Sequence, residues 1–167
     1  MIPIISIVGK SDSGKTTLLE KLIKGLSARG LRVATIKHDV HGFEIDHQGK
    51  DTWRHKQAGA AVTIISSPHK LAMIADTDHD YSLSEIRDEV IRGVDLILTE
   101  GYKRESHPKI EVYRSEMRRD LLCKSDDNLV AIAGDPSDAP ENIPIFDLNE
   151  PEPLCDFIEE RFLKSQP

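Results

Sequence analysis

A glycine-containing loop between an apolar run and a helical pattern constrains this chain of 167 residues more than any other feature. Residues 2–8 read IPIISIV, a nearly continuous apolar run that is typical of a strand buried on both faces of a sheet. The loop GKSDSGKTT follows at residues 9–17. Apolar residues then recur at helical spacing up to Gly30: Leu18, Leu19, Leu22, Ile23 and Leu26. The order strand, loop, helix predicts the start of an α/β fold.

The rest of the chain continues this alternation of short apolar runs and helical stretches. Strands are predicted at residues 31–36, 62–66, 70–75, 94–99, 109–114, 143–148 and in the region 129–134. The strand at 109–114 alternates apolar and polar residues, which favours an edge position. Helices are predicted at 49–60, at 154–162, and from the capping-box pair Ser82 and Glu85 onwards, with Leu83, Ile86 and Val90 on one face.

These elements favour a mostly parallel sheet with helices on both faces. No linker rich in Gly, Pro or Ser divides the chain, so we expect a single domain over residues 1–167. The net charge of −7 argues against a general nucleic-acid surface. Cys123 and Cys155 are far apart, which fits a reducing compartment and argues against a disulfide framework or a thiolate zinc site. The run at 2–8 is too short for a membrane span or a signal peptide, so we expect a cytoplasmic protein without a membrane partner.

The loop at 9–17 fits the pattern G-x-x-x-x-G-K-[ST] of a phosphate-binding loop (P-loop). Gly9 and Gly14 permit a turn whose backbone N–H groups face phosphate oxygens, and the N-terminus of the next helix adds partial positive charge. We expect Lys15 to reach the β and γ phosphates and Thr16 to ligate Mg²⁺. Without nucleotide, the Lys15 side chain is expected to face solvent. The predicted nucleotide contacts in the loop are Gly9, Lys10, Ser11, Asp12, Ser13, Gly14, Lys15, Thr16 and Thr17.

Polar residues follow three further predicted strands, at the edge where open parallel sheets bind ligands. They read Lys37-His38-Asp39, Glu100-Gly101-Tyr102-Lys103 and Gly134-Asp135. A carboxylate after a buried strand needs a partner, and Mg²⁺ beside the phosphates is a natural one for Glu100. Lys15 and Glu100 are therefore the candidate catalytic residues, and Thr16, Asp39 and Glu100 the candidate magnesium ligands.

The segment at 37–51, KHDVHGFEIDHQGKD, admits three interpretations. His38, His41 and His47 suggest a transition-metal site, but their spacing matches no common structural-zinc pattern. A solvated polar loop is the second interpretation. We favour the third, a mobile loop beside the P-loop that responds to nucleotide or binds a ligand. The residues proposed for that role are His38, Asp39, Asp46, Lys50, Asp51, Arg54 and Lys103.

The nucleotide base has no obvious reader, because the N-K-x-D motif is absent. Cys123-Lys124-Ser125-Asp126 imitates that motif but precedes a strand, whereas a base reader should follow one. Asp135 follows a strand and is placed to accept hydrogen bonds from guanine, although an Asp-Pro turn explains it almost as well. No glutamine or arginine is clearly placed for hydrolysis, so slow turnover is expected, with Arg54, Lys103 and Arg104 as candidate cations.

Residues 9–17, 36–60 and 98–103 together resemble the MobB family, GTP-binding proteins of molybdopterin guanine dinucleotide biosynthesis. The resemblance covers roughly the first two thirds of the chain. It implies a dimer that binds GTP and Mg²⁺, hydrolyses GTP weakly, and acts as an adaptor. The implied partner is the guanylyltransferase that joins GMP to molybdopterin, with other cofactor-biosynthesis proteins as further partners. Molybdopterin or its guanine dinucleotide is a second candidate ligand.

Two other functions remain open on the sequence. One is an ATP-dependent ligase or kinase resembling dethiobiotin synthetase, with Glu100 and Lys37 at a substrate pocket. The other is a metallochaperone GTPase whose histidines deliver nickel or a similar ion.

Overall fold

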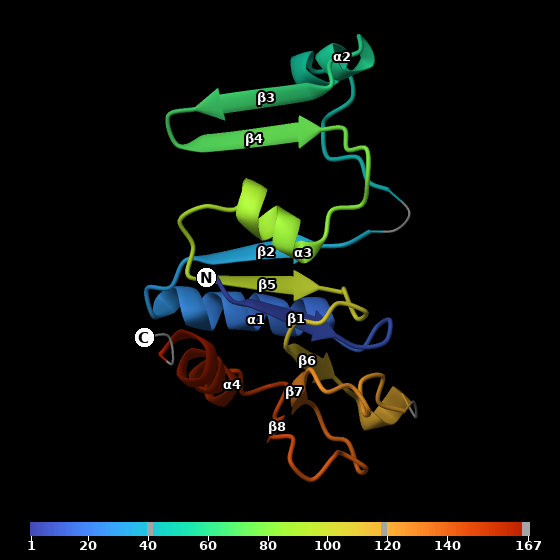
Figure 1. Cartoon of the computed structure of the whole chain (residues 1–167), viewed down its shortest axis with the longest axis vertical. Coiled ribbons are helices and arrows are strands. Elements are labelled where there is room, and N and C mark those ends of the chain that lie inside the picture. The colour runs from blue at the N-terminus through green and yellow to red at the C-terminus, as the bar shows by residue number, and fades with distance from the viewer. Residues whose placement is uncertain (40–41, 118–119, 165–167) are drawn as a thin grey trace. The chain divides into compact units, whose positions relative to one another are not determined.

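The computed structural model describes residues 1–39, 42–117 and 120–164 (Figure 1). The chain forms two compact units. The first combines Met1–His38 with the chain from Leu83 onwards, and the second is Asp39–Ser82. The prediction of a single domain over residues 1–167 stays a prediction. No helix in the described part of the chain is both long and apolar enough to cross a membrane.

The first unit is built on one parallel sheet, as predicted. Its strands lie in the order β2 (Val33–Lys37), β5 (Leu96–Glu100), β1 (Ile4–Val8), β6 (Lys109–Val112), β7 (Leu129–Ala133) and β8 (Ile145–Phe146). All five neighbouring pairs are parallel, so the carboxyl ends of the strands share one edge. β5 lies between β1 and β2, so β2 is not the direct neighbour of the P-loop strand. The expected position of the loop after β2 beside the P-loop stays a prediction.

The prediction of an edge strand at 109–114 is wrong, because β6 lies between β1 and β7. Its polar residues are buried with partners instead of facing water. Lys109 is 2% exposed and its Nζ lies 2.7 Å from Oδ2 of Asp126. Glu111 is 1% exposed and accepts hydrogen bonds from the backbone N–H groups of Leu122 and Cys123, at 2.6 and 2.9 Å. Alternation of charged and apolar residues therefore marks internal pairing in this strand.

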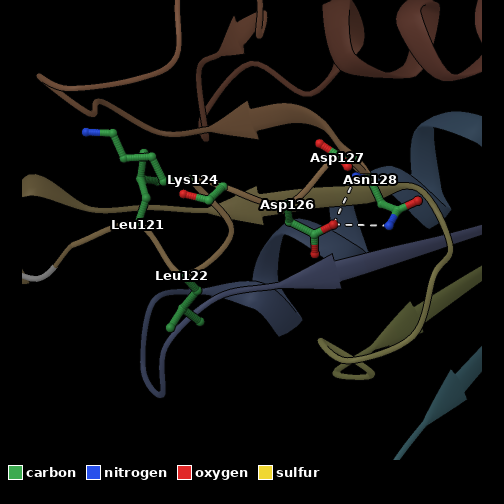
Figure 2. Close-up of a pocket in the computed structure, with 7 residues that line it drawn as sticks. Leu121, Leu122, Lys124, Asp126, Asp127 and Asn128 are labelled. Carbon is green, nitrogen blue, oxygen red and sulfur yellow. Dashed lines mark hydrogen bonds between the residues drawn. The ribbon is translucent and has the colours of Figure 1, made fainter.

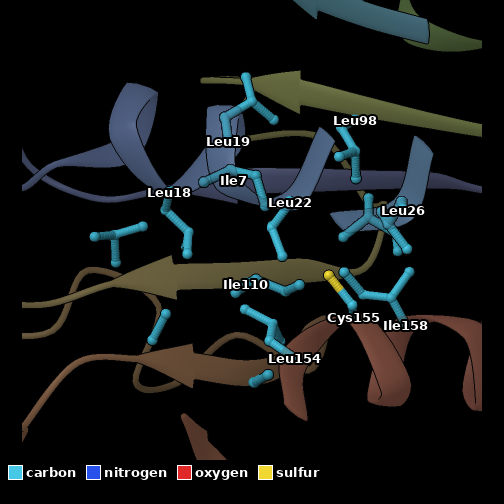
Figure 3. Packing of buried hydrophobic residues seen from close by; sticks show 14 of the residues in the cluster. Ile7, Leu18, Leu19, Leu22, Leu26, Leu98, Ile110, Leu154, Cys155 and Ile158 are labelled. Atoms are coloured by element: carbon cyan, nitrogen blue, oxygen red, sulfur yellow. The ribbon is translucent and has the colours of Figure 1, made fainter. Parts of the chain in front are cut away.

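Two helices cover one face of the sheet. α1 (Lys15–Ala28) places Leu18, Leu22 and Leu26 in the main core, where they join apolar residues of β1, β5 and β6 (Figure 3). α4 (Glu152–Ile158) continues as a π-helical turn, Glu159–Leu163, and adds Leu154 and Ile158 to the same core. The last turn of α1 is tied to α4 by Arg29, whose guanidinium bonds three carboxylates at 2.6–2.7 Å: Glu152, Asp156 and Glu159.

The other face is covered by shorter elements, so the prediction of helices on both faces is confirmed. α3 (Leu83–Glu85) continues as a π-helical turn, Ile86–Val90, and Leu83 packs on β1 and β5. Val90 is 53% exposed, so the predicted apolar face of this helix does not extend to it. On the same face, Leu121 and Cys123 pack against Val8 of β1 and Ile132 of β7.

The second unit contains α2 (Asp51–Gln57) and an antiparallel hairpin of β3 (Val62–Ser67) and β4 (Lys70–Ala75). The helix and both strands were predicted. The hairpin is a separate sheet, and most of its apolar side chains are exposed. Those at least half exposed are Val62, Ile64, Ile65, Leu71 and Met73.

Candidate functional site

The P-loop joins β1 to α1 and has the backbone that its sequence predicts. Gly9 and Gly14 have φ angles of 151° and 96°, which residues with a Cβ rarely adopt. α1 begins at Lys15, directly after Gly14 as its N-cap. The loop therefore ends at the N-terminus of a helix of 14 residues, the geometry in which backbone N–H groups and the helix dipole favour phosphate. Ser13 is buried, whereas Ser11, Asp12 and Thr17 are exposed.

The side chain of Lys15 folds back over this loop. Its Nζ donates a hydrogen bond to the carbonyl oxygen of Lys10 at 2.8 Å, and the residue is half-buried. The expectation that Lys15 faces solvent in the free protein is therefore wrong. An ammonium held above the loop is placed where an incoming phosphate can replace the carbonyl oxygen as its partner.

Thr16 and Glu100 lie together at the end of β5. The Thr16 hydroxyl oxygen is 3.1 Å from each carboxylate oxygen of Glu100. This contact joins the first turn of α1 to the strand beside β1. It places two oxygen ligands of the kind Mg²⁺ prefers beside the phosphate loop.

Two further predicted residues lie beside Glu100. Lys37 is its register partner across β2 and β5, and the His38 N–H donates to the Glu100 carbonyl at 3.4 Å. The rings of His38 and Tyr102 lie 4.9 Å apart. Tyr102 has a φ of 55°, a left-handed conformation that is uncommon for a residue with a side chain. Lys103 and Arg104 follow it and are exposed.

Sequence reasoning missed Arg114, which contacts the P-loop from the end of β6. Its Nε donates to the Ser13 carbonyl at 3.0 Å. Its guanidinium would lie 3.3 Å from a Cβ at Gly14, so the absence of a side chain there makes room for the arginine. The available signal was position, since only Tyr113 separates Arg114 from the end of a strand that is parallel to β1. The misassignment of that strand to an edge hid it.

Asp135 lies beyond β7, where it was predicted, and Ser115 fixes its carboxylate. The Ser115 N–H donates to Oδ1 at 2.9 Å, and its hydroxyl makes a short hydrogen bond to Oδ2. The side-chain hydrogen bond, followed by the backbone one, holds the pKa of Asp135 below its ordinary value. A cavity of about 370 Å³ opens here. Its lining consists of Arg114, Glu116, Gly134, Asp135 and residues 145–149.

The N-K-x-D imitation at 123–126 does not belong to this site. Asp126 pairs with Lys109 and accepts hydrogen bonds from Asn128 at the amino end of β7, on the edge of the sheet opposite to the P-loop (Figure 2). Lys124 pairs with Asp138 at 2.7 Å. An open depression of about 560 Å³ lies along this segment, lined by Leu121, Leu122 and residues 124–128. Lys124 and Asp126, the two side chains that would imitate a base reader, are therefore paired with other residues.

The remaining candidates of the 37–51 segment belong to the second unit. Asp46 accepts hydrogen bonds from the His47 N–H and from the Thr52 hydroxyl, so it holds the turn before α2. Lys50, Asp51 and Arg54 are exposed at the start of α2, and Asp39 is exposed as well. His41 lies outside the described residues. Among the residues described, no group of three His, Cys, Asp or Glu side chains is arranged to hold a metal ion.

The parallel sheet, the P-loop at the end of β1 and the Thr16–Glu100 contact define an α/β protein of the P-loop NTPase class. Residues 4–135 match the family described as MobB, molybdopterin guanine dinucleotide synthesis protein B. The chain belongs to this family.

Known relatives agree with that assignment over most of the chain. The molybdopterin-guanine dinucleotide biosynthesis adapter protein of Haemophilus influenzae is 40% identical over 161 residues, which cover 95% of this chain and 88% of that protein. The protein of the same name from Escherichia coli is 37% identical over 166 residues, 96% of this chain and 93% of that protein. The crystal structure of Bacillus subtilis MobB superimposes with a TM-score of 0.73 at 28% identity, over 95% of this chain and 97% of that one.

Proposed function

We propose that this protein is a GTP-binding, weakly GTP-hydrolysing adaptor of molybdopterin guanine dinucleotide biosynthesis. Membership of the MobB family and the names of two relatives support the pathway and the adaptor role. The observation that carries the nucleotide part is the contact between Thr16 and Glu100 at the mouth of the P-loop. The proposed partner is the molybdopterin guanylyltransferase, which implies a cytoplasmic location. Molybdopterin or its guanine dinucleotide is a further candidate ligand.

Thr16 and Glu100 would hold Mg²⁺ on a bound triphosphate. Both supply oxygen ligands and they already lie within 3.1 Å of each other, so the donor set fits this ion. Asp39 stays a candidate third ligand. Mg²⁺ would offset the negative charge of the β and γ phosphates, and Lys15 would add a second positive charge after leaving the Lys10 carbonyl.

We expect slow hydrolysis because the candidate cations are all exposed on loops or on a short helix. Lys103 and Arg104 follow Glu100, and Arg54 lies on α2 in the second unit. Within residues 1–39, 42–117 and 120–164, no hydrogen bond or ion pair holds the side chain of Arg54, Lys103 or Arg104 at a fixed position beside the P-loop. Rapid phosphoryl transfer requires such a charge to be preorganised.

For the base, we propose the cavity beyond β6, β7 and β8. Asp135 supplies a carboxylate whose orientation Ser115 fixes. Each carboxylate oxygen has more than one acceptor position, so the contacts to Ser115 leave capacity for guanine N1 and N2. Phe146 also lines the cavity and offers an apolar ring beside those polar groups.

A second copy of this chain is the partner we propose for the hairpin, Val62–Ala75. A two-stranded hairpin is marginally stable by itself, and this one leaves Ile65 59% and Leu71 67% exposed. Its sequence contains no acidic residue and one lysine, although the whole chain carries a net charge of −7. Two hairpins can therefore pair through apolar side chains without charge repulsion.

Titration calorimetry with GTP, GDP and ATP in the presence of Mg²⁺ tests the proposal. We expect GTP to bind more tightly than ATP. Tighter binding of ATP would contradict the GTP assignment and favour the ligase or kinase alternative, for which Lys37 lies beside Glu100 in register.

A further inference from the structure

Arg114 is a side chain outside the loop motif that contacts the backbone of the P-loop. Its Nε donates to the Ser13 carbonyl at 3.0 Å, and its guanidinium occupies the space that a side chain at Gly14 would fill. Ser13 and Gly14 directly precede the lysine of the motif. An arginine in this place fixes the backbone from which the phosphate-binding N–H groups project.

The next residue, Ser115, fastens a different part of the site. Its N–H and hydroxyl both bond the Asp135 carboxylate after β7. Two consecutive residues at the end of β6 thus hold the P-loop and the proposed base pocket. Arg114 itself lines the cavity that contains Asp135. The guanidinium therefore lies between the phosphate loop and the cavity.

The charge of Arg114 is only loosely neutralised. The Glu116 carboxylate has Oε1 3.5 Å from Nη1, and the arginine side chain is 39% exposed. Asp135, which lines the same cavity, is the second carboxylate that the arginine charge reaches. On the opposite side of the P-loop, Thr16 faces Glu100 at the proposed magnesium position. The Arg114 cation thus faces the region between phosphates and base, away from the γ-phosphate end.

We infer that Arg114 is a nucleotide-positioning residue, which holds the P-loop in its binding shape and faces the phosphate nearest the base. The inference rests on the proposed nucleotide-binding function. Because the α-phosphate is common to GTP and GDP, Arg114→Ala should weaken both nucleotides by similar factors, about tenfold each. A residue that reached the γ-phosphate would affect GTP alone.

Calorimetry with GTP and GDP is the first test, on Arg114→Ala, Arg114→Lys and Arg32→Ala. Arg32 is a matched control, because its guanidinium also packs over a glycine with positive φ, Gly93. Arg32 directly precedes β2, at the amino ends of the strands and away from the P-loop. Arg32→Ala should bind within twofold of the parent protein. Arg114→Lys should recover part of the lost affinity. Unchanged binding by Arg114→Ala, or a loss confined to GTP, would overturn the inference.

Hydrogen exchange on the nucleotide-free protein is the second test, and it does not depend on the ligand. Arg114→Ala should speed exchange of the amides in residues 13–16 by at least about fivefold, while the amides of β1 and β7 keep the parent rates. Unchanged exchange in the loop would refute the positioning role even if GTP binds. If the parent protein binds no nucleotide but Arg114→Ala loosens the loop, the proposed function fails and the hold on the P-loop stands. If Arg114→Ala does not fold, the same comparison is made with Arg114→Lys. This variant should speed exchange of the loop amides to a smaller extent. Loop amides that exchange as slowly as in the parent protein would count against the inference.

Discussion

Thr16 and Glu100, 84 residues apart in the chain, are within hydrogen-bonding distance at the mouth of the P-loop. The hydroxyl oxygen lies equally far, 3.1 Å, from both carboxylate oxygens. In the nucleotide-free protein the Thr16 hydroxyl is thus bonded to the carboxylate that we propose as a magnesium ligand.

Glu100→Gln should weaken the magnesium dependence of GTP binding. The amide keeps an oxygen for Thr16 but loses the negative charge, so the gain in GTP affinity on adding Mg²⁺ should fall about tenfold, equivalent to about 1.4 kcal/mol. Calorimetry with and without Mg²⁺ measures this gain. Glu20→Gln, on the exposed side of α1, is the control. A Glu100→Gln protein with the parent response to Mg²⁺ would rule out this carboxylate as a ligand.

Lys15→Ala should abolish measurable GTP binding while leaving the fold in place. The substitution removes one half-buried hydrogen bond to Lys10, so the free energy of unfolding should fall by about 1 kcal/mol or less. Urea unfolding followed by circular dichroism measures this loss, and calorimetry measures binding. Lys24→Ala, exposed on the same helix, should bind GTP like the parent protein. Retained GTP affinity in Lys15→Ala would contradict the proposal that GTP binds at the P-loop.

Leu71→Asp should dissociate the proposed dimer. The side chain is 67% exposed on the hairpin, and a carboxylate there would be buried without a partner if two hairpins pair. Light scattering coupled to size exclusion gives the mass directly. Val90→Asp introduces the same charge at an exposed apolar residue of the first unit and should keep the parent mass. A parent protein that is already monomeric would refute the dimer.

Glu111→Ala should destabilise the fold strongly although the residue lies outside the proposed site. It would leave the partly buried N–H of Leu122 and the buried N–H of Cys123 without their acceptor, at a cost of about 3 kcal/mol in the free energy of unfolding. Chemical denaturation measures the change. The exposed Glu89→Ala should stay within about 0.5 kcal/mol of the parent protein. Equal stability of the two variants would show that the Glu111 contacts contribute nothing.

The pair of Lys109 and Asp126 predicts a defined response to acid. The hydrogen bond from Lys109, followed by that from the Asn128 backbone, holds the pKa of Asp126 below its ordinary value of 3.8. A carboxyl with a lowered pKa in the folded state stabilises the protein above the ordinary value, and this contribution is lost as the pH falls through the lowered one.

Asp126→Asn should therefore be less stable than the parent protein at pH 6, and the difference should shrink below about pH 4. Urea titrations from pH 6 to pH 2 measure it. Asp127→Asn, at the exposed neighbouring position, should follow the parent protein at every pH. A difference that persists unchanged to pH 2 would contradict the role of ionisation.

The fold class and the nucleotide loop were predictable because each has a local signal. A buried strand, two glycines and an amphipathic helix identify the loop without tertiary information, and Glu100 follows the clearest internal strand in the sequence, at 94–99. The position of β6 was not predictable in this way, since Lys109 and Glu111 look solvated until their partners at 122–126 are seen. Arg114 was missed for the same reason. Its role depends on which strand lies beside β1, and that is a property of topology.

Helix α1 is anchored at both ends. At its start it carries Thr16, which meets Glu100, and just past its last turn Arg29 is clamped by three carboxylates of the C-terminal helix segment. A ligand that binds at the first turn of α1 therefore contacts a helix whose far end is held by the three ion pairs of Arg29. We therefore expect the helix to keep its place when the loop is occupied, and any change to appear first around Glu100 and Arg114, which contact the loop from the ends of β5 and β6.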